Sequence, residues 1–102
     1  MIELYQTEWC PASHRVRQRL TELEVDYIAR QVPVSREERT ALWASTGADS
    51  IPALVTEEGD AIVGEEAILE YLGERFDESE RAEEHRVKAA RVRRRDLEEA
   101  CA

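Results

Sequence analysis

The chain has 102 residues, which is enough for one compact domain with a modest core. Its 23 acidic and 14 basic residues give a net charge of −9, which argues against nucleic acid or an anionic membrane surface as a partner. No apolar run approaches the ~20 residues of a membrane span, and the N-terminus lacks the features of a signal peptide, so we expect a cytoplasmic protein.

The basic residues are unusual, because 13 are arginine and only Lys88 is lysine. An acidic surface with almost no lysine is typical of proteins from a high-salt cytoplasm. A GC-rich genome would also favour arginine over lysine, so the composition leaves both explanations open. The two cysteines, Cys10 and Cys101, lie at opposite ends of the chain, which fits neither a disulfide scaffold nor a metal motif.

The first predicted elements are a short strand over residues 2–5 and a helix over residues 11–24. Ile2 and Leu4 alternate on one face of the strand. The helix is predicted from an apolar face that is formed by Val16, Leu20 and Leu23. Cys10 therefore stands where a strand turns into a helix.

This position of Cys10 favours a reactive thiol. A residue at a helix N-cap faces backbone N–H groups without intrahelical partners and lies at the positive end of the helix dipole. Both stabilise a thiolate, which is the reactive form of cysteine. Pro11 suits the first helical position. We expect the amides of Ala12 and Ser13 to point at the sulfur, and the Ser13 hydroxyl to donate a further hydrogen bond.

A second strand is predicted over residues 25–32, followed by a helix over residues 36–45. Ser35 and Glu38 have the spacing of a capping box at the start of this helix. Trp43 is expected in the core or against another helix, and Gly47 is expected to end the helix. The order of strand, helix and strand predicts a right-handed βαβ unit.

An antiparallel hairpin is predicted next, with strands over residues 53–56 and 61–63. Pro52 is compatible with the start of a strand. Glu65 and Glu66 are expected to start a third helix, whose apolar face is formed by Ile68, Leu69, Leu72 and Phe76. Together these elements predict a small mixed sheet flanked by helices.

Residues 77–102 consist almost entirely of charged residues and alanine. We predict one long, largely solvated helix capped by Asp77, with acids near its start and arginines near its end, as the helix dipole favours. Its thin apolar stripe, which could pack on the domain or on a second chain, is formed by Val87, Ala90 and Leu97. We divide the chain into a domain over residues 1–76 and this extension.

Three motifs occur in a recognisable order: Trp9-Cys10-Pro11-Ala12-Ser13 after the first strand, Ile51-Pro52 before the hairpin, and Val-Gly-Glu-Glu-Ala-Ile-Leu-Glu-Tyr-Leu over residues 63–72. The chain resembles a glutaredoxin over residues 1–76, and also the closely similar N-terminal domain of glutathione transferases. The resemblance implies an α/β thioredoxin-like fold, in which the order βαβ-α-ββα forms a four-stranded mixed sheet, here with an extra C-terminal helix.

The resemblance also implies roles for individual residues. Pro52 is expected to be cis and to lie against Cys10, while the backbone of Ile51 pairs with the cysteinyl part of a bound thiol peptide. The turn that contains Glu65 and Glu66 is expected to hold the γ-glutamyl end. Trp9 is expected to line the substrate groove.

Two positions depart from the family pattern. Thr7 stands where many glutaredoxins carry lysine, and Glu66 stands where serine, threonine or aspartate is usual. The carboxylates of glutathione require cationic or N–H partners, which these two side chains do not supply. We therefore expect glutathione or a related low-molecular-weight thiol as co-substrate, and no bound cofactor or metal.

The predicted function is a glutaredoxin-like thiol–disulfide oxidoreductase that uses a single cysteine. The Cys10 thiolate would attack a mixed or protein disulfide, and a second thiol would release it. Ser13 cannot serve as a resolving cysteine. One alternative is a non-catalytic binding module with the thioredoxin fold. The other is a transferase-like domain that conjugates a thiol to electrophiles. This alternative is weakened because the chain lacks the all-helical second domain that supplies the electrophile pocket.

The expected partners are a small thiol and disulfide-containing proteins. We expect no nucleic acid or membrane partner, and either a monomer or a weak homodimer through the C-terminal helix. Other candidate groups have simpler explanations: His14 and His85 are expected at the solvent-exposed surface, and Cys101 is expected to be an incidental thiol.

Overall fold

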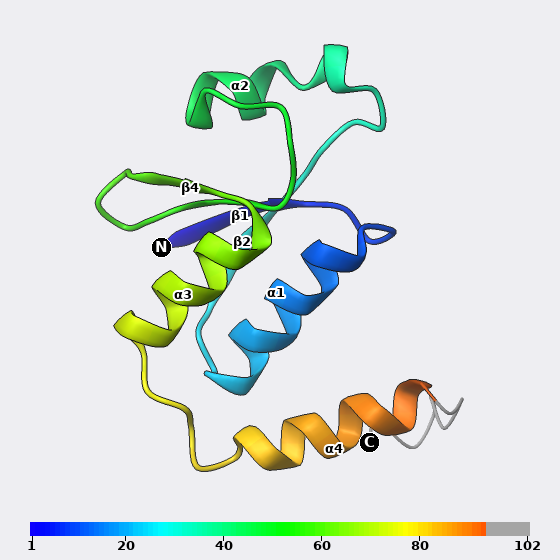
Figure 1. The fold of residues 1–102 in the computed structure, drawn as a ribbon, viewed down its shortest axis with the longest axis vertical. Helices are drawn as coiled ribbons and strands as arrows, with labels where there is room; N and C mark the ends of the chain where they lie inside the picture. The colour runs from blue at the N-terminus through cyan, green and yellow to red at the C-terminus, as the bar shows by residue number, and fades with distance from the viewer. Residues whose placement is uncertain (94–102) are drawn as a thin grey trace.

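The computed structural model describes residues 1–93 of the chain (Figure 1). Four strands form one sheet in the order β2-β1-β3-β4. The central strand β1 is parallel to β2 and antiparallel to β3, and β3 is antiparallel to β4. The strand bounds are Ile2–Gln6 for β1, Tyr27–Gln31 for β2, Ala53–Val55 for β3 and Ala61–Val63 for β4.

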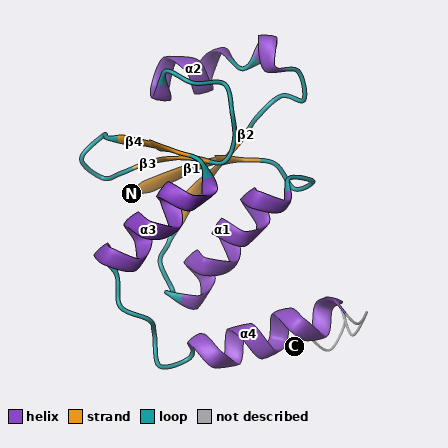
Figure 2. Cartoon of the chain, viewed as in Figure 1, coloured by secondary structure: helices purple, strands orange, loops and turns teal. Residues whose placement is uncertain are grey.

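Helices cover both faces of this sheet (Figure 2). Helices α1 and α3 lie on one face and α2 lies on the other, while α4 packs beneath α1. The predicted thioredoxin-like α/β fold is therefore confirmed. The helix bounds are Pro11–Glu22 for α1, Thr40–Thr46 for α2, Glu65–Arg75 for α3 and Ala82–Arg93 for α4, and a short 3-10 helix, η1, spans Arg36–Glu38.

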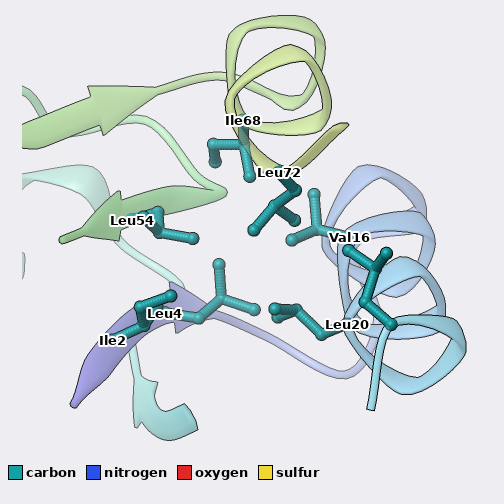
Figure 3. Close-up of a cluster of buried hydrophobic side chains, with 8 residues drawn as sticks. Ile2, Leu4, Val16, Leu20, Leu54, Ile68 and Leu72 are labelled. Carbon is teal, nitrogen blue, oxygen red and sulfur yellow. The ribbon is translucent and has the colours of Figure 1, made fainter. Parts of the chain in front are cut away.

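The main hydrophobic core lies between the sheet and the pair α1 and α3 (Figure 3). The apolar faces predicted for the first strand and for these two helices meet here. Each fully buried leucine or isoleucine contributes roughly 1.5–3 kcal/mol through removal from water. The core consists of Ile2, Leu4, Val16, Leu20, Leu23, Leu54, Ile68 and Leu72.

A smaller cluster fixes α2 to the opposite face of the sheet. Leu42 is 1% exposed and packs with Tyr5, Val32 and Ala53. The Tyr5 hydroxyl and the Ser45 Oγ lie 2.8 Å apart and form a hydrogen bond. Tyr5 is thus a core residue.

The helix predicted over residues 36–45 is interrupted in the structure. Arg39 has φ −82° and ψ 51°, which separates η1 from α2. The prediction of a capping box is wrong, because the Ser35 side chain makes no capping hydrogen bond. The prediction that Trp43 lies in the core or against another helix is also wrong, since Trp43 is 60% exposed. The predicted stop at Gly47 is confirmed by its left-handed φ of 72°.

The start of the C-terminal helix was also predicted wrongly. Helix α4 begins at Ala82, so Asp77 does not cap it. Ala82 is buried, whereas Val87, which was predicted in the apolar stripe, is 47% exposed. Leu97 lies outside the described residues. Among the described helices, none has both the length and the apolar character needed to cross a membrane.

Charged contacts, rather than apolar ones, hold α4 in place. Arg86 lies 3.0 Å from both Glu22 and Glu78, and Arg19 lies 3.0 Å and 2.7 Å from the same two carboxylates. We call these four residues the α1–α4 charge cluster. Only one side chain of the described part of α4, that of Ala82, is buried. The ion pairs of the cluster therefore explain why α4 packs against α1.

A second group of ionic contacts joins α4 to the end of α1. Glu24 pairs with Arg81 and lies 3.0 Å from His85 Nε2. The hydrogen bonds from Arg81 and His85 hold the pKa of Glu24 at about 2, well below its usual range. His85 is therefore not a freely solvated residue, as the sequence had suggested.

Candidate active site

Three segments meet at one end of the sheet. Tyr5, Ala53 and Val63 form a row across β1, β3 and β4. The chain beyond this row leads from β1 to Cys10 and from β4 to the start of α3, while Pro52 immediately precedes β3 on the same side. The topology therefore brings the three predicted motifs to one edge of the sheet.

Cys10 caps the first helix, as predicted. It has an extended backbone conformation, and its sulfur accepts a hydrogen bond from the Ser13 amide over 3.4 Å. The Cys10 carbonyl accepts the first helical bond from the His14 amide at 3.0 Å. Pro11 occupies the first helical turn. The thiol is partly exposed and accessible from solvent.

The surroundings of Cys10 favour its thiolate. Partial burial raises the pKa of the thiol, but hydrogen bonding by the Ser13 hydroxyl and by the Ser13 and Ala12 amides more than offsets this effect. The positive charge of Arg17 acts in the same direction. The pKa of Cys10 is therefore lower than that of an ordinary cysteine, which increases the fraction of reactive thiolate at neutral pH.

The Ser13 hydroxyl is part of the same effect, because it is one of the donors that favour the thiolate. It is fully buried and has no hydrogen-bond partner of normal geometry among the described residues. A buried hydroxyl without a partner costs about 1–3 kcal/mol. A thiolate at Cys10 is an acceptor within its neighbourhood, so ionisation of the thiol offers Ser13 a partner. The Thr7 hydroxyl is a second buried group without a partner in the described part of the chain.

Arg17 is a site residue that the sequence analysis missed. Its guanidinium donates hydrogen bonds to Gln6 Oε1 at 2.6 Å, to the Thr7 carbonyl at 3.1 Å and to Glu8 Oε1 at 3.1 Å. Arg17 thereby fixes the loop before Cys10 and brings a positive charge to the place where Thr7 itself offers none. Side chains of a helix reach back toward its N-terminus, and this rule was the available signal.

The Ile51–Pro52 peptide bond is cis, as the resemblance implied. Pro52 is fully buried, and its carbonyl accepts a hydrogen bond from the Gly64 amide at 2.9 Å. Ile51 is half-buried beside the smaller core cluster. The hydrogen bond between the Gly64 amide and the Pro52 carbonyl ties the cis-proline segment to the start of α3.

Glu65 links the starts of α1 and α3. Its two carboxylate oxygens accept hydrogen bonds from Arg15, one of them over 2.8 Å from Nη2. The bonds from Arg15 lower the pKa of Glu65. Glu66 is exposed and lies with Glu65 on the wall of a 420 Å³ surface pocket, which is lined by Val63, Gly64, Glu65, Glu66, Ala67 and Glu70.

The remaining candidates lie in different surroundings. Trp9 is 59% exposed directly beside Cys10, and His14 is exposed on α1. Cys101 lies outside the described residues. Within the described part of the chain, no three His, Cys, Asp or Glu side chains form a group that could hold a metal ion.

The fold and the site define a class of protein: a thioredoxin-like domain with a cysteine at the N-cap of its first helix and a cis-proline at the same edge of the sheet. The family model for the glutathione S-transferase N-terminal domain matches residues 4–80. The chain therefore belongs to the glutathione S-transferase N-terminal domain family.

Solved structures agree with this assignment. A glutathione S-transferase from Rhodospirillum rubrum F11 is 32% identical, with a TM-score of 0.64 over 74% of this chain and 34% of its own. A diazinon-metabolizing glutathione S-transferase from the silkworm, Bombyx mori, is 28% identical, with a TM-score of 0.66 over 74% and 38%. A third, from Methylobacillus flagellatus with glutathione bound, is 22% identical, with a TM-score of 0.64 over 74% and 37%, and shows the fold alone.

The chain thus spans between 34% and 38% of the length of these three structures. No curated protein matches it. Glutathione S-transferases, rather than glutaredoxins, are the proteins that the family match and these structures name. They support the transferase-like alternative better than the glutaredoxin-like function that the sequence first favoured.

Proposed function

We propose that this domain of the glutathione S-transferase N-terminal family carries out thiol–disulfide exchange, in which Cys10 transfers a low-molecular-weight thiol between disulfides. The observation that carries this proposal is the position of the Cys10 sulfur, which accepts the Ser13 amide at the N-cap of α1. Membership of the glutathione S-transferase N-terminal domain family supports a role in thiol chemistry, and Cys10 is the thiol of the described residues. In this proposal Ser13 donates hydrogen bonds to the Cys10 thiolate, and Pro11 starts the helix whose N-terminus faces it.

The reaction has two balanced steps. The Cys10 thiolate attacks the sulfur of the small thiol in a mixed disulfide, forming a new disulfide with Cys10 and releasing the other half as a thiolate. A second molecule of the small thiol, as its thiolate, then attacks the sulfur that is bound to Cys10. This step releases an oxidised dimer of the small thiol and restores the Cys10 thiolate. Protons pass between the thiols and water.

The substrate groups proposed from the resemblance fit the same edge of the sheet. The Ile51 backbone would pair with the cysteinyl part of the thiol, beside Pro52 and the exposed ring of Trp9. Glu65, already oriented by Arg15, and Glu66 would face the amino end of a γ-glutamyl group. Glutathione, which is bound in the structure from Methylobacillus flagellatus, or a related thiol is the proposed co-substrate.

The proposed partners are this thiol and disulfide-containing proteins, with no nucleic acid or membrane. A reduced Cys10 requires a reducing compartment, which favours the cytoplasm. The proposed assembly is a monomer or a weak homodimer through α4.

The test compares the intact chain with Cys10→Ser and with Cys101→Ser as a matched control. Turnover of a mixed disulfide between glutathione and a small organic thiol should be lost in Cys10→Ser and retained in Cys101→Ser. Mass spectrometry should find the small thiol bound to Cys10 after exposure to its oxidised form. Full turnover in Cys10→Ser would refute the proposal.

Conjugation of a bound thiol to an electrophile is the second candidate, and membership of the family favours it. It makes the opposite prediction for the same variant. A serine hydroxyl at position 10 could donate a hydrogen bond to the thiolate of a bound thiol, so conjugation to a chloronitroarene should persist in Cys10→Ser. If neither reaction occurs in the intact chain, the domain is a non-catalytic binding module.

A further inference from the structure

Arg39 is the most buried cation of the described residues, with 6% of its surface exposed. Its Nε donates to the Pro33 carbonyl at 2.8 Å, and its Nη2 donates to the Val34 carbonyl at 3.1 Å. Its Nη1 donates to the Asp49 carbonyl at 2.8 Å. No carboxylate of the described residues pairs with it. Burial of a charge is costly, so these main-chain contacts are what retain it.

The three acceptors belong to two separate segments. One is the connection between β2 and η1, and the other is the loop that leads from α2 to β3. Asp49 lies two residues before Ile51 and three before the cis-proline Pro52. Arg39 therefore ties the segment that carries the Ile51–Pro52 peptide to the body of the domain.

The loop's other hydrogen bonds lie at its two ends, and at the second end Ile51 and Pro52 also pack into the domain. At its start the Thr46 hydroxyl donates to the Leu42 carbonyl at 2.8 Å and accepts from the Ala48 amide at 3.2 Å. At its end the Pro52 carbonyl accepts from the Gly64 amide. Between them, Arg39 on the Asp49 carbonyl supplies the anchor from outside the loop.

We infer that Arg39 is a positioning residue for thiol binding, because it sets the main chain of Ile51 at the edge that also holds Cys10. This inference rests on the proposed function. The three hydrogen bonds of the Arg39 side chain go to main-chain carbonyls and none goes to Cys10, so we place its effect on binding rather than on thiol ionisation. A guanidinium fork can reach all three carbonyls at once, and the single ammonium of lysine cannot.

The test uses the full chain with Arg39→Gln and Arg39→Lys. Arg36→Gln is the matched control, since Arg36 lies three residues earlier on η1 and is exposed. In the mixed-disulfide assay, both Arg39 variants should raise the KM for the small thiol roughly tenfold or more, because small displacements of a binding group have large effects. The kcat at saturating thiol should change little, and the pH profile of Cys10 alkylation should not move.

Amide hydrogen exchange provides a readout that does not depend on activity. The amides of residues 51–54 should exchange faster in both Arg39 variants, while those of α1 should remain protected. If the intact chain turns over no thiol, the proposed function fails. Amide hydrogen exchange at residues 51–54 then still tests whether Arg39 holds this segment in place. If the intact chain is active and a folded Arg39→Gln keeps its KM and its exchange pattern, the inference is wrong. An equal rise in KM in Arg36→Gln would also overturn it.

Discussion

At the scale of single residues, the lowered pKa of Cys10 depends on hydrogen-bond donors at the start of α1. The amides of the first turn have no helical acceptors, so they stabilise negative charge on the sulfur. Ser13 adds a buried hydroxyl, and Arg17 adds a charge from two turns further along α1. The site thus uses one short helix both as scaffold and as the source of its electrostatics.

Arg17 provides a test of the charge contribution to this arrangement. Arg17→Met removes the charge and three hydrogen bonds to the loop before Cys10. The pKa of Cys10 should rise, so the thiolate fraction at pH 7 and the alkylation rate should fall, by roughly two- to tenfold. The rate should be recorded against pH with iodoacetamide.

Two controls separate charge from position. Arg17→Lys should retain part of the pKa effect because it keeps the charge. Arg30→Met, on β2 and paired with Glu3, should leave the profile unchanged. A profile in Arg17→Met that coincides with that of the unmodified chain would show that Arg17 has no electrostatic role.

At the scale of elements, α2 shows how two adjacent residues can have opposite roles. Leu42 is 1% exposed against the sheet, whereas Trp43 is 60% exposed. Leu42→Ala should lower the free energy of unfolding by about 2–5 kcal/mol, because it opens a cavity in the smaller cluster. Trp43→Ala should change it by about 0.5 kcal/mol or less. Urea unfolding followed by circular dichroism measures both, and comparable losses would contradict the burial pattern.

Sequence periodicity predicted the strands, α1, α3 and the main core because burial there repeats along regular elements. It failed at α2, where the backbone of Arg39 departs from helical angles, the Arg39 side chain contacts three carbonyls of other segments, and Trp43 is exposed. Such contacts join distant segments and leave no periodic signal. The start of α4 was missed in a similar way, since the segment before it is irregular and Ser79 Oγ donates a hydrogen bond to the distant Glu22 carbonyl.

The candidate site was predictable to the same extent. The N-cap position of Cys10 followed from the local pattern and the cis-proline from the family resemblance, and both are confirmed. The contacts of Arg17 and the ion pair of Arg15 with Glu65 depend on where the ends of long side chains lie. The spacing of residues in a motif does not specify this. Their contribution could be identified only once the helix and loop were placed in space.

The α1–α4 charge cluster leads to a prediction about how α4 is held. Arg86→Ala removes contacts to Glu22 and Glu78, and Glu22 is a buried carboxylate. The extension should detach more often, so protease should cleave the segment 77–81 several-fold faster. Arg91→Ala, on the exposed side of the same helix, is the matched control and should leave the rate unchanged. Equal cleavage in both variants would mean that apolar contact at Ala82 holds the helix.

At the scale of the whole molecule, two electrostatic effects oppose each other. The excess acidic side chains behind the net charge of −9 repel one another and destabilise the folded state, and added salt screens this repulsion. Ion pairs across the surface stabilise the fold, and salt weakens them, since the screening length falls from about 10 Å at 0.1 M to about 3 Å at 1 M. Exposed pairs are individually worth about 0–1 kcal/mol.

We expect relief of repulsion to prevail for the domain as a whole. Its melting temperature should therefore rise between 0.1 M and 2 M potassium chloride, as a protein adapted to a high-salt cytoplasm would require. Docking of α4 should respond in the opposite direction, because the α1–α4 charge cluster is what holds it. Calorimetry and protease cleavage at residues 77–81, measured over the same salt series, separate the two effects. A melting temperature that falls with salt would show that ion pairs dominate, and would favour a GC-rich genome as the origin of the arginine-rich composition.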